Sequence, residues 1–368
     1  MKKTPGENRS LEAATRFAVI AFIAFFVASC GASGTNHPYP PADPAIRSMA
    51  HMEYLSDAIG TRVAGTASES EALNYVRAEF LAMGYQPEIQ PFAALGGDRV
   101  AGSSNIIAVL KGGSDKEIIV GAHYDSVDVG RGYSDNASGV GLMLAMAERL
   151  KQSNPPFTIR FIAFGAEEIG LVGSLYHAAN MSDTEIANTI GMINLDTVVG
   201  GDMTYVYGGA DEQGWMRDQA LDIATMRHIG LQTNPGLNPA YPKGTTGDWS
   251  DHAPFRELGI DYLYFEATNW EIGDLDGWMQ TAKFGEIYHT VNDNSAFFDR
   301  EYPGRVESQL RDFAMVLEEF LLTVKPPDSS ARSILGDQTG RRTIEMRYMH
   351  RDGTPIDHLQ RHERRHQR

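Results

Sequence analysis

The feature that most constrains the fold is a short apolar run with two polar residues at its end. Residues 117–122 read Glu-Ile-Ile-Val-Gly-Ala, the pattern of a strand buried on both faces of a mainly parallel sheet. His123 and Asp125 follow it. Because side chains alternate along an extended backbone, both are expected to project from the same face of the strand end.

Helices and strands alternate along the rest of the chain. Hydrophobic periodicity predicts helices at 46–59, 68–83, 137–150, 169–180 and 305–323, and strands at 85–92, 105–110, 158–164, 190–195 and 203–207. Strands separated by helices of about ten to fifteen residues indicate an open α/β sheet with helices on both faces. The predicted fold class is therefore α/β, with a mainly parallel central sheet.

Titratable residues follow the other predicted strands. Glu167 and Glu168 follow one strand and Asp196 follows another, while Asp135 precedes a helix and His289 comes much later. Each has an ordinary alternative, such as helix capping by Asp135 or a turn at Asp196. Gathered at one edge of a sheet, however, several carboxylates repel one another unless cations are present. Because imidazole and carboxylate groups bind zinc, the set predicts a two-metal hydrolase site.

The first thirty residues have the pattern of a secretory signal. Basic residues precede an apolar run of about twelve residues at 17–28, which is too short to cross a bilayer as a helix. The run ends in Val27-Ala-Ser-Cys30, which resembles a bacterial lipobox. We therefore expect a lipoprotein signal peptide at 1–29, lipidation of Cys30 and a flexible tether at 30–43. An uncleaved anchor and an ordinary signal peptide with an incidental cysteine are the alternatives.

This leader predicts an exported protein, anchored by lipid in a bacterial cell envelope and facing the periplasm or the exterior. Cys30 is the only cysteine, so an exported domain at 44–326 must rely on its own core. The net charge of −16 argues against nucleic acid as a partner. Residues 327–368 lack apolar periodicity and are rich in arginine, which predicts a disordered basic tail.

Several segments of this chain, which include the candidate metal ligands, resemble the co-catalytic dizinc aminopeptidases of the leucine-aminopeptidase and transferrin-receptor-like class. The matching segments occur in the family's order over roughly residues 46–325: Gly-Ala-His123-Tyr-Asp125-Ser, Ser134-Asp135-Asn-Ala-Ser-Gly-Val, Phe164-Gly-Ala-Glu167-Glu168-Ile-Gly-Leu-Val-Gly-Ser, Asn194-Leu-Asp196 and Tyr288-His289-Thr-Val-Asn-Asp293. Similarity to the alkaline phosphatase isozyme conversion aminopeptidases rests on three more: Ser250-Asp-His252-Ala-Pro-Phe, Phe265-Glu-Ala-Thr-Asn-Trp270 and Asp276-Gly-Trp-Met-Gln280.

The resemblance implies an aminopeptidase with two zinc ions per chain, and it assigns a ligand to each position. One zinc would take His123 and Asp196, the other would take Glu168 and His289, and Asp135 would bridge the two.

The remaining matched residues would then assist the chemistry. Glu167 would be the general base that takes a proton from the zinc-activated water, and Tyr288 would either donate a hydrogen bond to the oxyanion or simply pack. Asp125 and Asp293 would each accept a hydrogen bond from the ring N–H of a ligating histidine that does not face the metal, which fixes the tautomer of that histidine.

Peptide or protein N-termini are the implied substrates. The acidic residues Glu266, Glu271, Asp274 and Asp276 suggest a pocket that favours N-terminal Arg or Lys, although a solvated acidic loop explains them equally well. His252 is a further candidate for substrate contact. Two other functions stay open: a single-zinc glutaminyl cyclase on the same fold, and a binding module that has lost its metals. Five filled ligand positions together with Glu167 favour hydrolysis.

Overall fold

The computed structural model describes residues 43–96 and 99–327, without the side chains of 94–101. The expected signal peptide, Cys30, nearly all of the tether and the basic tail from residue 328 lie outside the described residues. In the described part, no helix combines the length and the apolar composition needed to cross a membrane.

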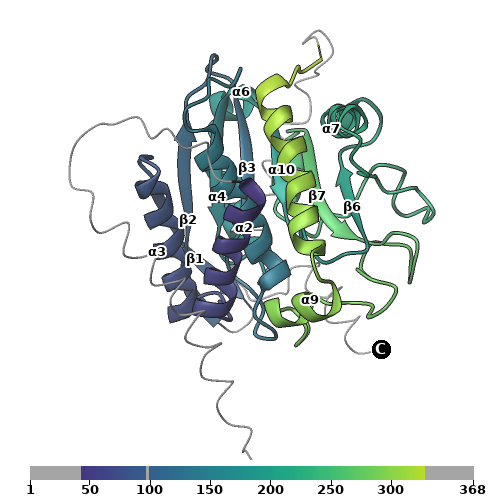
Figure 1. Ribbon diagram of the computed structural model, residues 1–368. Helices are drawn as coiled ribbons and strands as arrows, with labels where there is room; N and C mark the ends of the chain where they lie inside the picture. The colour runs from purple at the N-terminus through teal and green to yellow at the C-terminus, as the bar shows by residue number, and fades with distance from the viewer. Residues whose placement is uncertain (1–42, 97–98, 328–368) are drawn as a thin grey trace, which may run out of the picture. The chain divides into compact units, whose positions relative to one another are not determined.

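Seven strands of the described chain form one sheet in the order β1-β2-β4-β3-β5-β7-β6 (Figure 1). The central strands β4, β3, β5 and β7 are parallel neighbours, whereas β1, β2 and β6 pair antiparallel at the two sides. The predicted α/β class with a mainly parallel centre is therefore confirmed. The strands are β1 (Glu88–Gly96), β2 (Arg99–Leu110), β3 (Glu117–His123), β4 (Thr158–Phe164), β5 (Thr189–Leu195), β6 (Met203–Tyr207) and β7 (Tyr262–Thr268).

Helices cover both faces of this sheet. In Figure 1, α2, α4 and α10 lie together across one face, and α3 and α7 belong to the same apolar core; α5 and α8 pack on the opposite face. The helices are α2 (Pro44–Glu53), α3 (Ala67–Ala82), α4 (Ser138–Leu150), α5 (Val172–Asn180), α6 (Asp183–Asn188), α7 (Trp215–Met226), α8 (His252–Glu257), α9 (Ser295–Glu301) and α10 (Arg305–Thr323).

Strand β3 shows why the apolar run forms the middle of the sheet. Ile118 and Val120 join the core beneath α2, α4 and α10, whereas Ile119 packs with Phe164 and Phe255 on the other side. The whole strand is buried, as its continuous apolar pattern predicts.

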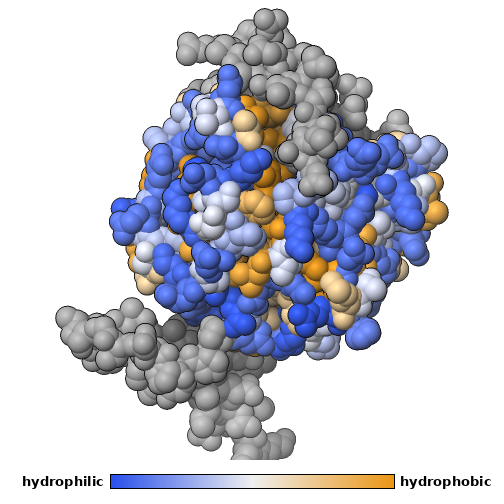
Figure 2. Space-filling model, turned by 90° about the horizontal axis from the view of Figure 1, so that it is seen from above, coloured by the Kyte–Doolittle hydropathy of each residue, from blue (hydrophilic) through white to orange (hydrophobic). Residues whose placement is uncertain are grey.

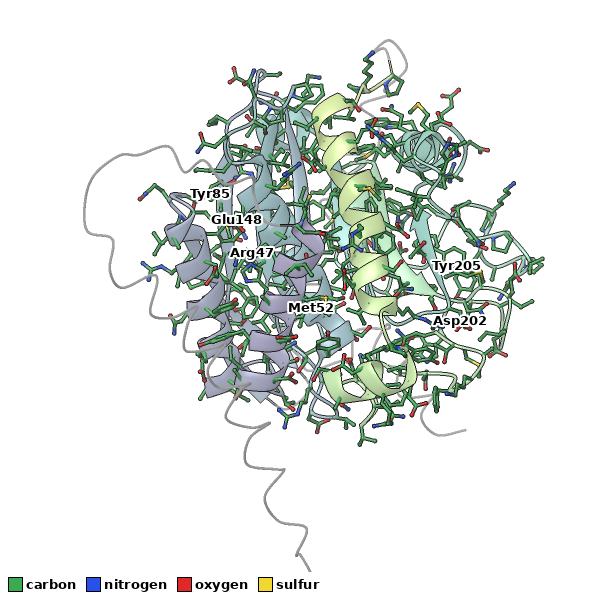
Figure 3. The ribbon with its side chains drawn as sticks, viewed as in Figure 1. Arg47, Met52, Tyr85, Glu148, Asp202 and Tyr205 are labelled. Atoms are coloured by element: carbon green, nitrogen blue, oxygen red, sulfur yellow. The ribbon has the colours of Figure 1, made fainter. Side chains whose placement is uncertain are left out.

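The packing of α2 against α4 combines surface and core contacts (Figure 3). Arg47 on α2 donates a hydrogen bond to Glu148 on α4 at 2.7 Å, and both side chains are about one-third exposed. An exposed pair of this kind contributes little stability. Met52 on the same helix is fully buried, and its burial contributes more to the free energy of unfolding than the ion pair does.

Two predicted helices differ from the observed ones. The helix expected at 46–59 is α-helical only to Glu53 and continues as a π-helical turn from Tyr54 to Ile59. The helix expected at 169–180 begins at Val172, because the preceding residues form a turn and Leu171 has a positive φ of 59°. Strand β7 was not predicted from the sequence, because Glu266 interrupts its apolar run, although every residue of the strand is buried.

Helix α9 lies close to the loop that follows β3. It follows Asp293, whose carboxylate accepts a hydrogen bond from the backbone N–H of Ser134, in the loop after β3. Figure 2 views the molecule from the opposite end, where hydrophilic residues dominate and apolar ones are exposed between them.

Candidate metal centre

Three parallel strands bring the acidic residues and a histidine to one edge. His123 ends β3 and pairs in register with Phe164 at the end of β4, just before Glu167 and Glu168. On the other side of β3, Gly121 pairs with Asn194 of β5, so Asp196 lies level with His123. The carboxyl ends of parallel strands coincide, which is why residues distant in sequence meet here.

Asp135 stands between the two histidines. Its Oδ1 lies 3.1 Å from Nε2 of His123, and its Oδ2 lies 3.0 Å from Nε2 of His289. Each oxygen of one carboxylate therefore faces a different imidazole. A carboxylate in this position has the geometry of a bridging ligand.

The potential ligand atoms form two sets that share Asp135. Within each set the atoms lie within 4.8 Å of one another, and the sets are His123, Asp135, Asp196 and Asp135, Glu168, His289. A third set, His123, Glu167 and Glu168, overlaps both. The donors in the first two sets are imidazole nitrogens and carboxylate oxygens, which zinc accepts. The arrangement therefore fits the predicted pair of zinc sites.

The turn that carries Glu167 and Glu168 is held by side chains from strand β2 and from the loop after β3. The N–H of Gly165 donates to Asn105 Oδ1 on β2 at 3.2 Å. The N–H groups of Glu167 and Glu168 donate to the two oxygens of Asp125 at 3.0 and 3.2 Å. The turn needs this support because Ala166 has a left-handed φ of 57°, which is costly for a residue with a Cβ atom.

The two expected support residues, Asp125 and Asp293, both bind backbone. Asp125 Oδ1 lies 3.6 Å from Nδ1 of His123, beyond hydrogen-bond distance, while its hydrogen bonds go to the turn after β4. Asp293 accepts from the N–H groups of Ser134 at 2.6 Å and Asp135 at 3.2 Å. Asp293 therefore fixes the loop that carries Asp135.

Burial and charge set the protonation of the central residues. Burial raises the pKa of Glu167 well above its usual value; Glu168, Asp251 and Asp196 raise it further, against the lowering effect of His123. Burial lowers the pKa of His123, but nearby carboxylates, Glu167 first, outweigh burial and raise it well above normal. So many buried acids around two imidazoles make a site that favours cations.

The predicted substrate-contacting acids separate into two groups. Glu266 and Asp276 are buried, and Glu266 accepts a hydrogen bond from the hydroxyl of Tyr207 at 2.7 Å. Burial, opposed by that hydrogen bond, raises the pKa of Glu266 to about 8. In contrast, Glu271 and Asp274 are exposed.

His252 and Tyr288 have well-defined surroundings. His252 is 0% exposed, and its ring lies 4.6 Å from that of Tyr262, between centroids, so it offers no surface to a substrate. Burial lowers the pKa of His252 to about 4. The hydroxyl of Tyr288 donates to the backbone carbonyl of Trp278 at 3.1 Å, and burial raises the pKa of Tyr288 well above normal, helped by Glu266.

Arg62 is an important residue near the site that the sequence analysis missed. Its side chain is 0% exposed, and it donates hydrogen bonds to five backbone carbonyls, those of Leu55, Gly60, Tyr124, Arg131 and Gly132. Its charge also lies near Asp293, Asp125 and Asp135. No spacing or motif marks it, because all of its partners are backbone carbonyls.

Glu69 was also missed, although a local signal was present. Thr66-x-x-Glu69 has the spacing of a capping box, and Thr66 does accept a hydrogen bond from the N–H of Glu69. The Glu69 carboxylate, however, accepts from Ser103 Oγ and from the N–H of Gly65, both at 2.6 Å. It is buried, and Ala166 also donates a backbone hydrogen bond to it.

Comparison with known proteins agrees with this geometry. Residues 105–314 match Peptidase family M28. Alkaline phosphatase isozyme conversion protein from Escherichia coli (strain K12) is 37% identical over 290 residues, which cover 70% of this chain and 84% of that protein. The resemblance predicted from the motifs is therefore confirmed.

Two solved structures share the fold. BSAP, a zinc aminopeptidase from Bacillus subtilis, has a TM-score of 0.62 at 20% identity, covering 78% of this chain and 98% of that chain. A glutaminyl cyclase from Bacteroides thetaiotaomicron has a TM-score of 0.60 at 20% identity, covering 78% of this chain and 100% of that chain. At this identity they show the fold alone. The sequence match over more than half of the chain decides the family: this protein belongs to Peptidase family M28.

Proposed function

We propose that this peptidase is an aminopeptidase that hydrolyses the N-terminal bond of peptides or proteins at a centre of two zinc ions. The observation that carries the proposal is the position of Asp135. Its two oxygens face His123 at 3.1 Å and His289 at 3.0 Å, and it is common to both ligand sets.

In this proposal each zinc has its own pair of residues besides Asp135. His123 and Asp196 hold one ion, and Glu168 and His289 hold the other. Zinc ions bound there would supply a nucleophilic water at neutral pH and polarise the scissile carbonyl.

Glu167 is the proposed general base. It is a neighbour of Glu168 and is buried, and it lies outside both three-residue sets that share Asp135. Its carboxylate takes the proton of the attacking water and passes it to the leaving amine. Tyr288 is the proposed hydrogen-bond donor to the oxyanion, and its hydroxyl would have to leave the carbonyl of Trp278, to which it donates in the structure, in order to do so.

The glutaminyl cyclase alternative is supported by fold likeness at 20% identity. A single-zinc enzyme needs one ligand set, whereas this chain has two sets with a shared carboxylate. The inactive binding module is less well supported, because such a module has no need of Glu167 beside a full ligand set. We therefore favour hydrolysis over both alternatives.

Glu266 and Asp276 support a preference for N-terminal Arg or Lys. Both are buried, and the carboxyl group of Glu266 acts electrostatically on Tyr288 and is itself influenced by Asp196 and Asp135. A buried carboxylate near the site would attract a cationic side chain of the substrate. Glu271 and Asp274, being exposed, fit the solvated-loop alternative better.

We also propose export and lipid anchoring, with a signal peptide at 1–29, a tether at 30–43, the enzyme domain at 44–326 and a basic tail at 327–368. Support comes from the apolar run and the Val27-Ala-Ser-Cys30 segment. Membrane fractionation and mass spectrometry of the mature N-terminus would test this proposal. A Cys30→Ser variant that still fractionates with membranes, or an unmodified Cys30, would contradict lipidation.

The enzymatic proposal is tested by counting metal and measuring turnover together. Purified protein is assayed for zinc per chain, for hydrolysis of a panel of aminoacyl anilides, and for cyclisation of N-terminal glutamine. We expect two zinc ions and anilide hydrolysis. One zinc with cyclisation and no hydrolysis would establish the cyclase instead, and absence of any metal-dependent turnover would favour the binding module.

A further inference from the structure

The turn between β4 and α5 donates four consecutive backbone N–H groups, those of residues 165–168, to side chains from elsewhere in the chain. Asn105 and Asp125 accept three of them, as described above. The fourth, the N–H of Ala166, donates to the carboxylate of Glu69 in the first turn of α3. A residue about 100 positions earlier in the sequence therefore holds the middle of this turn.

Ala166 is the residue of the turn whose backbone most needs support. It has a left-handed φ of 57°, which residues with a Cβ atom rarely adopt. Its carbonyl accepts from the N–H of Val172 at 3.1 Å, so its carbonyl and its N–H are both held. Ala166 directly precedes Glu167, and its backbone dihedrals therefore set the direction in which the Glu167 side chain leaves the turn.

The carboxylate of Glu69 is itself fixed by groups outside the turn. Its Oε1 accepts from Ser103 Oγ on β2 at 2.6 Å, and its Oε2 accepts from the N–H of Gly65 at 2.6 Å. The residue is only 2% exposed. Ser103 also lies against the turn, because a Cβ atom on Gly165 would come within 2.3 Å of its Oγ. Glu69 is therefore a rigid acceptor packed beside the turn.

Capping of α3 does not account for these contacts. In a capping box the glutamate three residues into the helix would accept from the N–H of the cap residue, Thr66. Here that N–H donates to the carbonyl of Val63 at 3.1 Å. The Glu69 carboxylate instead accepts from Gly65, Ser103 and Ala166, none of which belongs to the helix.

We propose that Glu69 is a positioning residue for the hydrolytic step: it holds Ala166 in its left-handed conformation and thereby keeps Glu167 directed at the metal centre. This inference rests on the proposed role of Glu167 as general base. Glu168, one residue further on, is also held from elsewhere, because its carboxylate accepts from the N–H of Val127 at 3.1 Å. Loss of Glu69 should therefore misplace the base and leave zinc bound.

The test compares Glu69→Met, which removes every acceptor of this side chain, with the wild-type protein in anilide hydrolysis. We expect kcat to fall by about 10–100-fold, with KM and zinc per chain unchanged. Glu79→Met is the matched control, because Glu79 is half-buried on the same helix and lies near Arg47 and Glu148 instead of the turn. The control should keep wild-type kcat. Thermal unfolding verifies that each variant is folded.

A double variant separates positioning of Glu167 from a general loss of structure. In a Glu167→Gln background, Glu69→Met should lower the residual kcat little further, because its effect passes through the side chain already replaced. If Glu69→Met does not fold, Glu69→Gln takes its place in both measurements. It keeps one acceptor oxygen, so we expect a smaller loss of kcat with the same non-additivity.

Three results would overturn the role of Glu69: wild-type kcat in the folded variant, loss of zinc, or losses that multiply in the double variant. Wild-type protein that binds zinc but hydrolyses no anilide would instead overturn the proposed aminopeptidase activity. A Glu167→Gln variant with full activity would overturn the general base. The failures of the two proposals are therefore distinguishable.

Discussion

The carboxylate of Asp125 holds the backbone of Glu167: its Oδ1 accepts the N–H of Glu167 at 3.0 Å, and its other oxygen accepts from the next residue at 3.2 Å. Both side chains are buried, so little water is available to replace this contact. The loop after β3 therefore positions the proposed general base, while the last residue of β3, His123, belongs to the ligand set.

Asp125→Asn is expected to lower kcat by about 10–100-fold with zinc content unchanged. An amide has one acceptor oxygen where the carboxylate has two, so one of the two backbone N–H groups loses its partner. Steady-state kinetics with metal analysis checks this expectation. Asp261→Asn is the control, since Asp261 accepts from Trp215 Nε1 at the start of β7. Wild-type kcat in Asp125→Asn would show that the turn holds its shape without this carboxylate.

Glu167→Gln is expected to reduce turnover by about 10²–10⁴-fold and to leave two zinc ions bound. Glutamine has the same size but cannot accept the proton of water. The measurement is anilide hydrolysis together with zinc per chain. Glu71→Gln, on the exposed face of α3, should behave like the wild type. If Glu167→Gln lost zinc as well as activity, its role would be that of a ligand.

Asp135→Asn is expected to abolish tight binding of both zinc ions, because this carboxylate belongs to both ligand sets. Asp196→Asn should weaken only one ion, because Asp196 belongs to one of those two sets. Zinc remaining after dialysis against a graded series of chelator concentrations distinguishes the two variants. Identical zinc loss in both variants would contradict a bridging role for Asp135.

The preference for N-terminal Arg over Leu is expected to rise with pH between about 6 and 9. The pKa of Glu266 is raised to about 8, so its carboxyl group is mainly neutral below that pH and ionised above it. Only the ionised form attracts a cationic side chain. The ratio of kcat/KM for arginyl and leucyl anilides is the appropriate measurement, because titration of the shared α-amino group cancels. Glu266→Gln should remove the rise, and a ratio that stays flat in the wild type would argue against this pocket.

Arg62→Met is expected to destabilise the fold by at least about 3 kcal/mol, because it leaves several buried carbonyls without donors. Arg62→Lys should recover only part of the loss, since an ammonium group has three donors and lacks the planar fork. Urea denaturation checks both variants. Arg47→Met is the control: Arg47 is about one-third exposed and should cost about 1 kcal/mol or less. A similar small loss in Arg62→Met would mean that water replaces the guanidinium.

The sequence by itself determined the α/β class, most strands of the sheet and the edge at which the site lies. A continuous apolar run predicts a strand that is buried on both faces of the sheet, and β3 is indeed buried along its whole length. Once such strands are parallel, residues that follow their ends must meet. His123, Glu167 and Asp196 could therefore be grouped from one-dimensional spacing alone.

Only the tertiary structure decided which residues support that site and which acids lie near it. Ser250 reaches Asp196 across 54 positions of sequence, and Arg62 reaches Gly132 across 70. The tertiary structure also shows that Glu266 and Asp276 are buried whereas Glu271 and Asp274 are exposed, a difference that the sequence does not reveal. Periodicity reports which face of an element is apolar. It carries no information on which distant backbone or carboxylate a polar side chain meets, because packing between elements sets that distance.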